Sequence, residues 1–182
     1  MADTLSLPVD LARLAAPFPP DAISWRVGST NSDKTKGLAL AYIDARDVMD
    51  RLDAVCGLTG WQCDYTPMPN GTTCCRIGVL VGGQWVWKSN GAGATGDVNQ
   101  EKEREMAEKG GYSDAFKRAA VVWGVGRYLY SLPSTWVELE QRGKSHVIKA
   151  SEYARLRAVA ARVPGASPKA QSPAPGAAGQ YT

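Results

Sequence analysis

Histidine and long apolar runs are scarce in this chain of 182 residues. The chain contains 1 histidine, His146, so it offers little material for a nucleophile–histidine pair. Its longest uninterrupted run of apolar residues and glycine, 119–126, is far shorter than the roughly 20 residues that cross a bilayer. The start of the chain carries Asp3 and Asp10 and lacks the basic region and apolar stretch of a secretory signal. We therefore expect no hydrolase of the serine–histidine type, no membrane partner and a cytoplasmic location.

The cysteines lack the spacing of a metal site. Cys56, Cys63, Cys74 and Cys75 form no Cys-x-x-Cys pair, and only His146 could join them as a ligand. Structural zinc sites are usually built from closely spaced pairs of such ligands. We expect reduced thiols in or near the core, and neither a metal nor a cofactor.

Charge is modest in total but unevenly distributed. The net charge of +3 is too small to indicate a polyanionic partner by itself. Residues 101–163 carry eight acidic and twelve basic side chains, whereas residues 1–60 carry eight acidic and six basic ones. The basic surplus therefore lies in the C-terminal third of the folded region.

Composition divides the chain into a folded domain, 1–163, and a Pro/Ala/Gly-rich tail, 164–182. The tail has four prolines, and Lys169 is its only charged residue. Such a segment has no apolar face to bury, so we expect it to be disordered and at most to contact other proteins.

Periodicity and turn signals predict an α+β domain with the core order β-β-α-β-β-β-α, in which an antiparallel meander packs on a long helix. Asp44 is a good N-cap for one helix and Gly57 a natural stop for it. We expect helices over 8–16, 44–57, 99–109, 112–129 and 151–163, and strands over 22–27, 37–42, 61–66, 73–81, 84–88, 136–140 and 144–148, the last two as a minor hairpin.

Two glycine-containing segments imitate phosphate-binding loops. Residues 91–96 match Gly-x-Gly-x-x-Gly, but a dinucleotide site needs this pattern after a parallel strand, and here an antiparallel meander precedes it. A glycine hinge is the favoured interpretation, and a nucleotide-cofactor enzyme using Gly91 to Gly96 stays an alternative. In Gly143-Lys144-Ser145 the first glycine of a Walker A loop is replaced by Glu138, so we expect no ATPase.

The acidic residues between Glu101 and Glu108 alternate with Lys102 and Arg104. A solvated helix face with local ion pairs explains this pattern. A metal-dependent nuclease that uses these acids is the second alternative.

The segment 112–130 is the most distinctive. At helical spacing Tyr112, Phe116, Ala119, Ala120 and Trp123 predict a buried stripe, with small alanines that allow a close approach to a sheet. Lys117 and Arg118 lie at one edge of this stripe, and Asp114 is placed to form an ion pair with Arg118 one turn later. Taken by itself, this pattern also fits an ordinary basic helix edge.

Several motifs together resemble the Rad52-type single-strand annealing family of double-strand-break repair. They are Tyr-Ile-Asp-Ala-Arg-Asp-Val-Met-Asp-Arg-Leu at 42–52, Gly60-Trp61, Ser-Asp-Ala-Phe-Lys-Arg-Ala at 113–119, Trp123-Gly124 and Arg-Tyr-Leu-Tyr at 127–130. The similarity runs from about residue 23 to residue 133 and is greatest to the bacterial DNA-damage-response branch that protects 3′ ends (the DdrA type) and its phage relatives.

This resemblance implies an ATP-independent protein that binds and anneals single-stranded DNA as a ring or helical homo-oligomer, in a bacterium or a phage-infected host. It implies that Lys117, Arg118 and Arg26 line a groove that holds the phosphates of one strand with the bases turned outward. The family often has a further basic residue where this chain has Val121, and we expect Arg127 to supplement the groove. The lysine of a second, outer DNA site is missing from 97–100.

The tryptophans fall into two groups. Trp61 and Trp123 occupy positions where core packing is expected. Trp85 and Trp87 share one face of a strand, and we expect them to serve a subunit interface.

Overall fold

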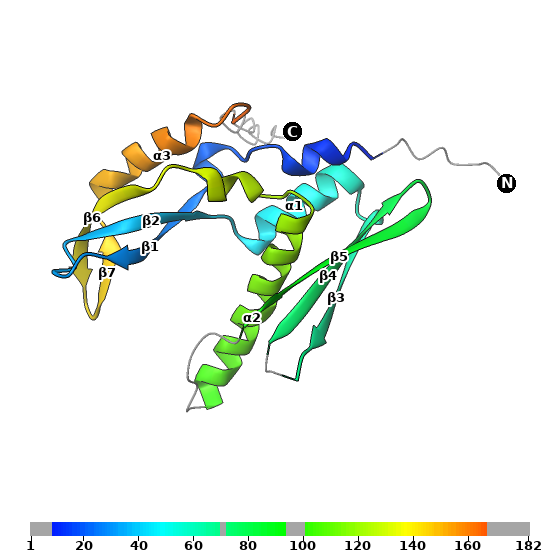
Figure 1. The fold of residues 1–182 in the computed structure, drawn as a ribbon, viewed down its shortest axis with the longest axis horizontal. Coiled ribbons are helices and arrows are strands. Elements are labelled where there is room, and N and C mark those ends of the chain that lie inside the picture. Colours follow the sequence, from blue (N-terminus) through cyan, green and yellow to red (C-terminus); the bar gives the residue numbers. More distant parts are fainter. Residues whose placement is uncertain (1–8, 70–71, 94–100, 167–182) are drawn as a thin grey trace, which may run out of the picture.

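The computed structural model describes residues 9–69, 72–93 and 101–166, with the backbone alone for 101–109. Figure 1 shows one antiparallel sheet on each side of the long helix α2 in this view. The first sheet has the order β1 (Ser24–Thr30), β2 (Lys36–Tyr42), β6 (Thr135–Arg142), β7 (Ser145–Ile148), and the second the order β3 (Trp61–Pro67), β4 (Thr73–Val81), β5 (Gln84–Ala92). The helices are α1 (Ala45–Cys56), α2 (Glu101–Val122) and α3 (Tyr153–Ala161), with short 3-10 turns η1 (Leu11–Ala15), η2 (Pro20–Ala22), η3 (Arg127–Ser131) and η4 (Ala150–Glu152). The α+β class and the antiparallel packing on a long helix are confirmed. None of the helices within the described ranges combines the length and the apolarity that a bilayer crossing requires.

Helix α1 begins and ends where the sequence predicts. The backbone N–H of Asp44 donates to the Asp47 carboxylate at 2.8 Å, which fixes the first turn. At the other end Gly57 has a φ of 77°, a conformation that glycine adopts without strain. Val48 and Leu52 lie on the face between these ends and are fully buried.

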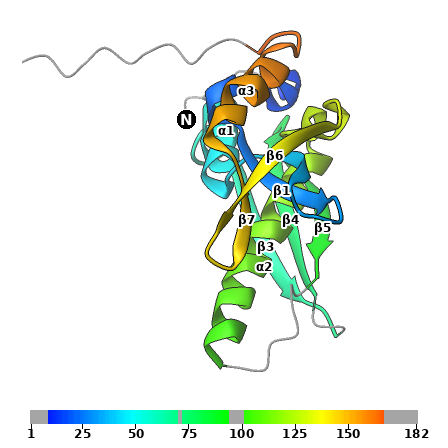
Figure 2. The same cartoon turned by 90° about the vertical axis from the view of Figure 1, so that its left-hand side faces the viewer.

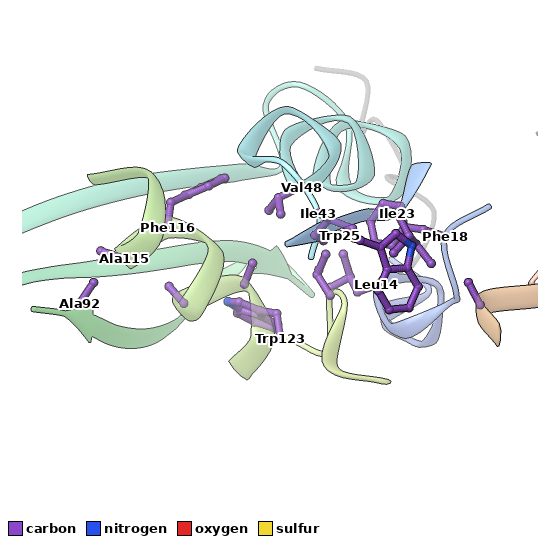
Figure 3. Packing of buried hydrophobic residues seen from close by; sticks show 14 of the residues in the cluster. Leu14, Phe18, Ile23, Trp25, Ile43, Val48, Ala92, Ala115, Phe116 and Trp123 are labelled. Carbon is purple, nitrogen blue, oxygen red and sulfur yellow. The ribbon is translucent and has the colours of Figure 1, made fainter. Parts of the chain in front are cut away.

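The three-stranded sheet packs its inner face on α2. Cys75, Ile77 and Val79 alternate along β4 and have no exposed surface. They share one buried cluster with Phe116, Ala115, Ala119 and Ala120 of α2, and the small alanine side chains let helix and sheet approach closely. Figure 3 shows Ala115 and Phe116 on α2, Trp123 just beyond the end of this helix, and Ala92 at the end of β5. The predicted stripe is confirmed except at its first residue, because Tyr112 is 38% exposed and contacts the ring of Tyr65 edge-on.

The Gly60-Trp61 pair joins α1 to this sheet. The Trp61 indole N–H donates to the Asp53 carboxylate at 2.6 Å, and its ring lies 6.0 Å from that of Phe116. A side chain at Gly60 would place its Cβ 2.0 Å from the carbonyl oxygen of Cys56. Only glycine therefore allows the chain to turn directly from α1 into β3.

Some sequence predictions of element type or extent were wrong, and one strand pairing was not predicted. The expected hairpin of β6 and β7 is present, with Leu139 opposite Ile148, but β6 also pairs with β2 over its first half, so the hairpin belongs to the first sheet. The long helix ends at Val122 rather than at 129, because the chain turns through Gly124 and Gly126 at positive φ before η3. The helix expected over 8–16 is only the 3-10 turn η1. The strand β5 extends to Ala92, so Gly91, expected in a glycine hinge, is paired with Cys74 in the sheet. Figure 2 shows the β6–β7 hairpin of the first sheet, with α3 above it.

The thiols are free, but they do not all belong to the core. Cys75 is buried and burial raises its pKa to about 12, while Cys56 and Cys74 are half-buried. Cys63 is exposed, which corrects the prediction for that residue. It lies on the short strand β3 at the edge of the sheet, where the inner face is only partly covered.

Candidate nucleic-acid interface

The ammonium of Lys117 projects from α2 over an aromatic ring of the first sheet. Its Nζ lies 5.7 Å from the centroid of Tyr42, the last residue of β2. This distance is within the range of a cation–π attraction. Within the described ranges Lys117 makes no ion pair, so its positive charge is not neutralised by a carboxylate.

Arg26 lies on the same side of the first sheet as Tyr42. In the β1–β2 register Arg26 is opposite Leu40 and Ser24 is opposite Tyr42, so Arg26 and Tyr42 are diagonal neighbours on one face. The alternation of burial agrees, since Arg26 is exposed while the preceding Trp25 is buried on the other face. Two of the predicted contacts, Arg26 and Lys117, are thus brought to one surface around the Tyr42 ring.

Arg118 points in a different direction from Lys117, because consecutive residues of a helix are about 100° apart. Its Nε donates to the Asp114 carboxylate at 3.0 Å, which confirms the ion pair expected from the spacing. The pair is about half exposed, so it orients the guanidinium and contributes little to stability. On this side Asn90 of β5 donates through Nδ2 to the Arg118 carbonyl at 3.4 Å.

Arg127 lies beyond the end of α2, in η3, and folds back onto that end. Its Nε donates to the Val121 carbonyl at 2.9 Å and its Nη2 to the Val122 carbonyl at 2.7 Å. These are carbonyls of the last turn, which have no partner inside the helix. The guanidinium thus caps α2 while remaining exposed at the surface.

Lys88 is a cation of this region that the sequence analysis missed. Its Nζ lies 3.4 Å from the same Val122 carbonyl and 4.3 Å from the centroid of the Trp123 ring. Alternation along β5 could have found it, since Trp85 and Trp87 occupy one face and Lys88 the opposite one, toward α2. A lysine on the helix-facing side of a strand is unusual enough to indicate a specific contact.

The outer face of the three-stranded sheet carries an aromatic pair. The rings of Trp85 and Trp87 lie 6.3 Å apart and are 40% and 37% exposed. The guanidinium of Arg76 lies 4.6 Å from the Trp87 ring and is also paired with Asp64, whose pKa is lowered by that hydrogen bond. Trp87 covers Gly78, where a Cβ would come within 3.0 Å of the indole.

A profile of the Rad52/22 family of double-strand break repair proteins matches residues 10–147. The chain belongs to the Rad52/22 family. Two curated relatives are both described as the single-stranded DNA-binding protein DdrA. One, from Deinococcus radiodurans, is 39% identical over 150 residues, which is 79% of this chain and 66% of the relative. The other, from Deinococcus deserti, is 41% identical over 126 residues, 69% of this chain and 58% of the relative. The chain therefore spans less than two thirds of the length of either relative.

The Rad52/22 match includes all of the predicted contact residues and also Lys88. It ends within β7, so η4 and α3 lie outside it. The resemblance stated from the sequence motifs is confirmed at the level of the family and its DdrA relatives.

The fold of this Rad52/22 member does not suit the nucleotide-cofactor alternative. Gly91 is paired with Cys74 inside the antiparallel sheet, whereas a dinucleotide loop leads from a parallel strand into a helix of a βαβ unit. Residues 94–96 of that motif lie outside the described residues. For the nuclease alternative, the side chains from Glu101 to Glu108 are likewise not described. In the rest of the described chain no group of three His, Cys, Asp or Glu residues could hold a metal ion.

Proposed function

We propose that this chain is an ATP-independent protein that binds single-stranded DNA and anneals complementary strands in recombinational repair. Lys117, Arg118 and Arg26 hold the phosphates of one strand, and Arg127 supplements them. The bases face outward, where a second strand can pair with them. The proposal extends to this chain the single-stranded DNA binding that is named for the DdrA relatives.

The observation that carries this proposal is the arrangement around Tyr42. Lys117 from α2 and Arg26 from β1 reach one surface from distant parts of the sequence. Both side chains present N–H donors, and neither forms an ion pair among the described residues. Phosphate contacts of this kind give affinity that does not depend on base sequence, which suits a protein that must anneal any strand.

Oligomerisation is the second part of the proposal. A single copy offers only a few phosphate contacts, and repetition around a ring or along a helix turns them into a continuous track with high avidity. We place the Trp85–Trp87 face at a contact between copies, because exposed, adjacent indoles are typical of interface cores. The neighbouring Arg76–Asp64 pair would lie at the polar rim of that contact.

The remaining parts of the proposal concern the role in the cell. Protection of 3′ ends follows from the same phosphate grip when the strand is held at its terminus. The protein acts by binding rather than by covalent chemistry, in the cytoplasm of a bacterium or a phage-infected host. The tail 164–182 lies for the most part outside the described residues, and we propose contact with other repair proteins as its role.

An annealing assay tests the function directly. Two complementary oligonucleotides, one labelled with a donor and one with an acceptor dye, are mixed with the protein in EDTA without ATP. We expect pairing to be accelerated many-fold over the spontaneous rate, and a Lys117→Ala/Arg118→Ala variant to lose most of the acceleration. Acceleration that requires ATP or magnesium, or that survives in the double variant, contradicts the proposal.

A further inference from the structure

Two cations from different elements meet at the C-terminal end of α2. Arg127, which follows the helix, and Lys88, which comes from β5, both donate to the Val122 carbonyl, at 2.7 Å and 3.4 Å. The Lys88 ammonium also lies over the Trp123 ring, whose own N–H is tied to the Ile77 carbonyl at 3.0 Å. The position of Lys88 is therefore fixed by the core beneath it.

Backbone carbonyls at the end of α2, and not carboxylates, position the side chains of Lys88 and Arg127. The last carbonyls of an α-helix carry a partial negative charge, which attracts cations without cancelling a full unit of charge. Neither Lys88 nor Arg127 forms an ion pair with any residue in the described ranges. Lysine has three N–H donors and arginine five, so each keeps donors for a ligand after capping the helix.

Lys88 reaches α2 from the same strand as Asn90, which contacts the helix at Arg118. Asn90, two residues after Lys88 on the same face of β5, donates to the Arg118 carbonyl. Val122 follows Arg118 by one helical turn, about 5.4 Å along the axis. Lys88 and Asn90 of β5 thus both contact backbone carbonyls of α2 within this turn, whereas Lys117 lies over Tyr42 of the first sheet.

We propose that Lys88, together with Arg127, forms a second phosphate contact at the C-terminal end of α2, so that each copy holds one DNA strand on both sides of this helix. The inference rests on the proposed function. It adds Lys88 to the DNA contacts and extends the course of the bound strand past the C-terminal end of α2. The ligand is the sugar–phosphate backbone of the same strand, since Lys88 and Arg127 are cations with N–H donors and meet at Val122, one helical turn after Arg118.

The slope of log affinity against log salt concentration separates a phosphate contact from a helix cap. Each phosphate contact with a single strand contributes about 0.7 to this slope through counterion release, whereas loss of a cap leaves the slope unchanged. The probe is fluorescein-labelled oligo(dT), titrated with the full chain at several salt concentrations. The variants are Lys88→Gln, Lys88→Arg and the matched control Lys144→Gln, which removes the same charge from the β6–β7 turn. Thermal unfolding and particle mass are measured for each variant.

We expect Lys88→Gln to weaken binding several-fold and to make the slope less steep by about 0.7, while Lys88→Arg and Lys144→Gln behave like the parent chain. An unchanged slope for Lys88→Gln, with Lys117→Ala still weakening binding, overturns this inference and leaves the proposed function in place. An equal change in Lys144→Gln also overturns it, because the effect is then one of net charge. If Lys88→Gln does not fold, Lys88→Met replaces it, because methionine removes the charge and keeps the packing on Trp123. A slope less steep by about 0.7 in Lys88→Met then supports the inference, and an unchanged slope overturns it.

Discussion

The Nζ of Lys117 lies 5.7 Å from the centre of the Tyr42 ring, so that a cation from α2 is positioned by an aromatic side chain from β2. Tyr42 is also the diagonal neighbour of Arg26 across the β1–β2 pair. The contact joins α2 to β2, and it therefore places Lys117 near Arg26 in the proposed groove.

The role of the ring predicts a difference between two substitutions of Tyr42. Tyr42→Phe keeps the aromatic face and should leave the affinity for oligo(dT) within twofold of the parent chain. Tyr42→Leu removes the attraction, worth about 0.5–1 kcal/mol, and should weaken binding by about two- to fivefold. Fluorescence anisotropy measures both. Equal affinities for the two variants would show that the ring does not position Lys117.

The capping contacts of Arg127 predict an effect on stability that is independent of DNA. Arg127→Ala removes two hydrogen bonds to the Val121 and Val122 carbonyls and should lower the free energy of unfolding by about 1 kcal/mol. Arg142→Ala is the matched control, since its only described contact is an exposed pair with Glu140, and should cost less than about 0.5 kcal/mol. Urea unfolding followed by tryptophan fluorescence gives both values, and a smaller loss for Arg127→Ala than for the control would contradict the capping role.

Two glycines predict opposite effects of the same substitution. Gly60→Ala forces a Cβ against the Cys56 carbonyl and should destabilise the chain by more than about 2 kcal/mol. Gly110→Ala places a methyl group in open space inside α2 and should stabilise it by about 0.5–1 kcal/mol, because glycine is a poor helix former. The order of the two thermal midpoints is the check, with Gly110→Ala expected above the parent chain and Gly60→Ala far below it.

The aromatic pair on the outer sheet face predicts a change of assembly. A Trp85→Ser/Trp87→Ser variant should form smaller particles than the parent chain, measured by analytical ultracentrifugation. Trp136→Ser, another exposed tryptophan but on the first sheet, is the control and should leave the mass unchanged. A parent chain that is already monomeric, or a variant of the same mass, would remove this face from the proposed contact between copies.

The thiols predict an order of chemical modification and a pH dependence. Cys63 is exposed and Cys75 is buried with its pKa raised to about 12 by desolvation, so iodoacetamide at pH 8 should modify Cys63 well before Cys75. An unfolded thiol has a pKa of about 8.5, so the neutral Cys75 thiol contributes stability below that pH. This contribution declines as the pH rises from about 8.5 toward 12. Peptide mapping of the alkylated protein shows the order, and earlier modification of Cys75 would contradict the burial of that side chain.

Local patterns predicted the parts of this fold that local interactions determine. Asp44 and Gly57 mark the ends of α1 because a cap and a positive φ are properties of single residues. Gly82 and Gly83 mark the β4–β5 turn for the same reason, with φ values of 57° and 80°. The ion pair of Asp114 with Arg118 follows from helical spacing alone.

The parts that the sequence did not reveal depend on contacts between distant segments. The pairing of β6 with β2 joins residues far apart in the chain, and neither strand indicates its partner. The end of α2 at Val122 is not evident in the sequence because the apolar run continues to Gly126; the chain turns there through Gly124 and Gly126, and Lys88 and Arg127 contact the Val122 carbonyl. Lys117 and Arg118 on α2 were predicted, because helical spacing and the family resemblance both identify them. Lys88 on β5 was not predicted, because only the packing of the sheet on α2 brings it to the end of the helix.

The account depends most on the Lys117–Arg118 pair as a grip on phosphates, and one titration tests it most directly. Fluorescein-labelled oligo(dT) is titrated with the parent chain and with Lys117→Ala/Arg118→Ala at about 50 mM and 200 mM salt, after both proteins have been shown to have the same particle mass. We predict magnesium-independent binding that weakens steeply with salt in the parent chain, and a slope less steep by about 1.4 in the variant, together with a large loss of affinity. Equal affinity and equal slope for the two proteins would contradict the account.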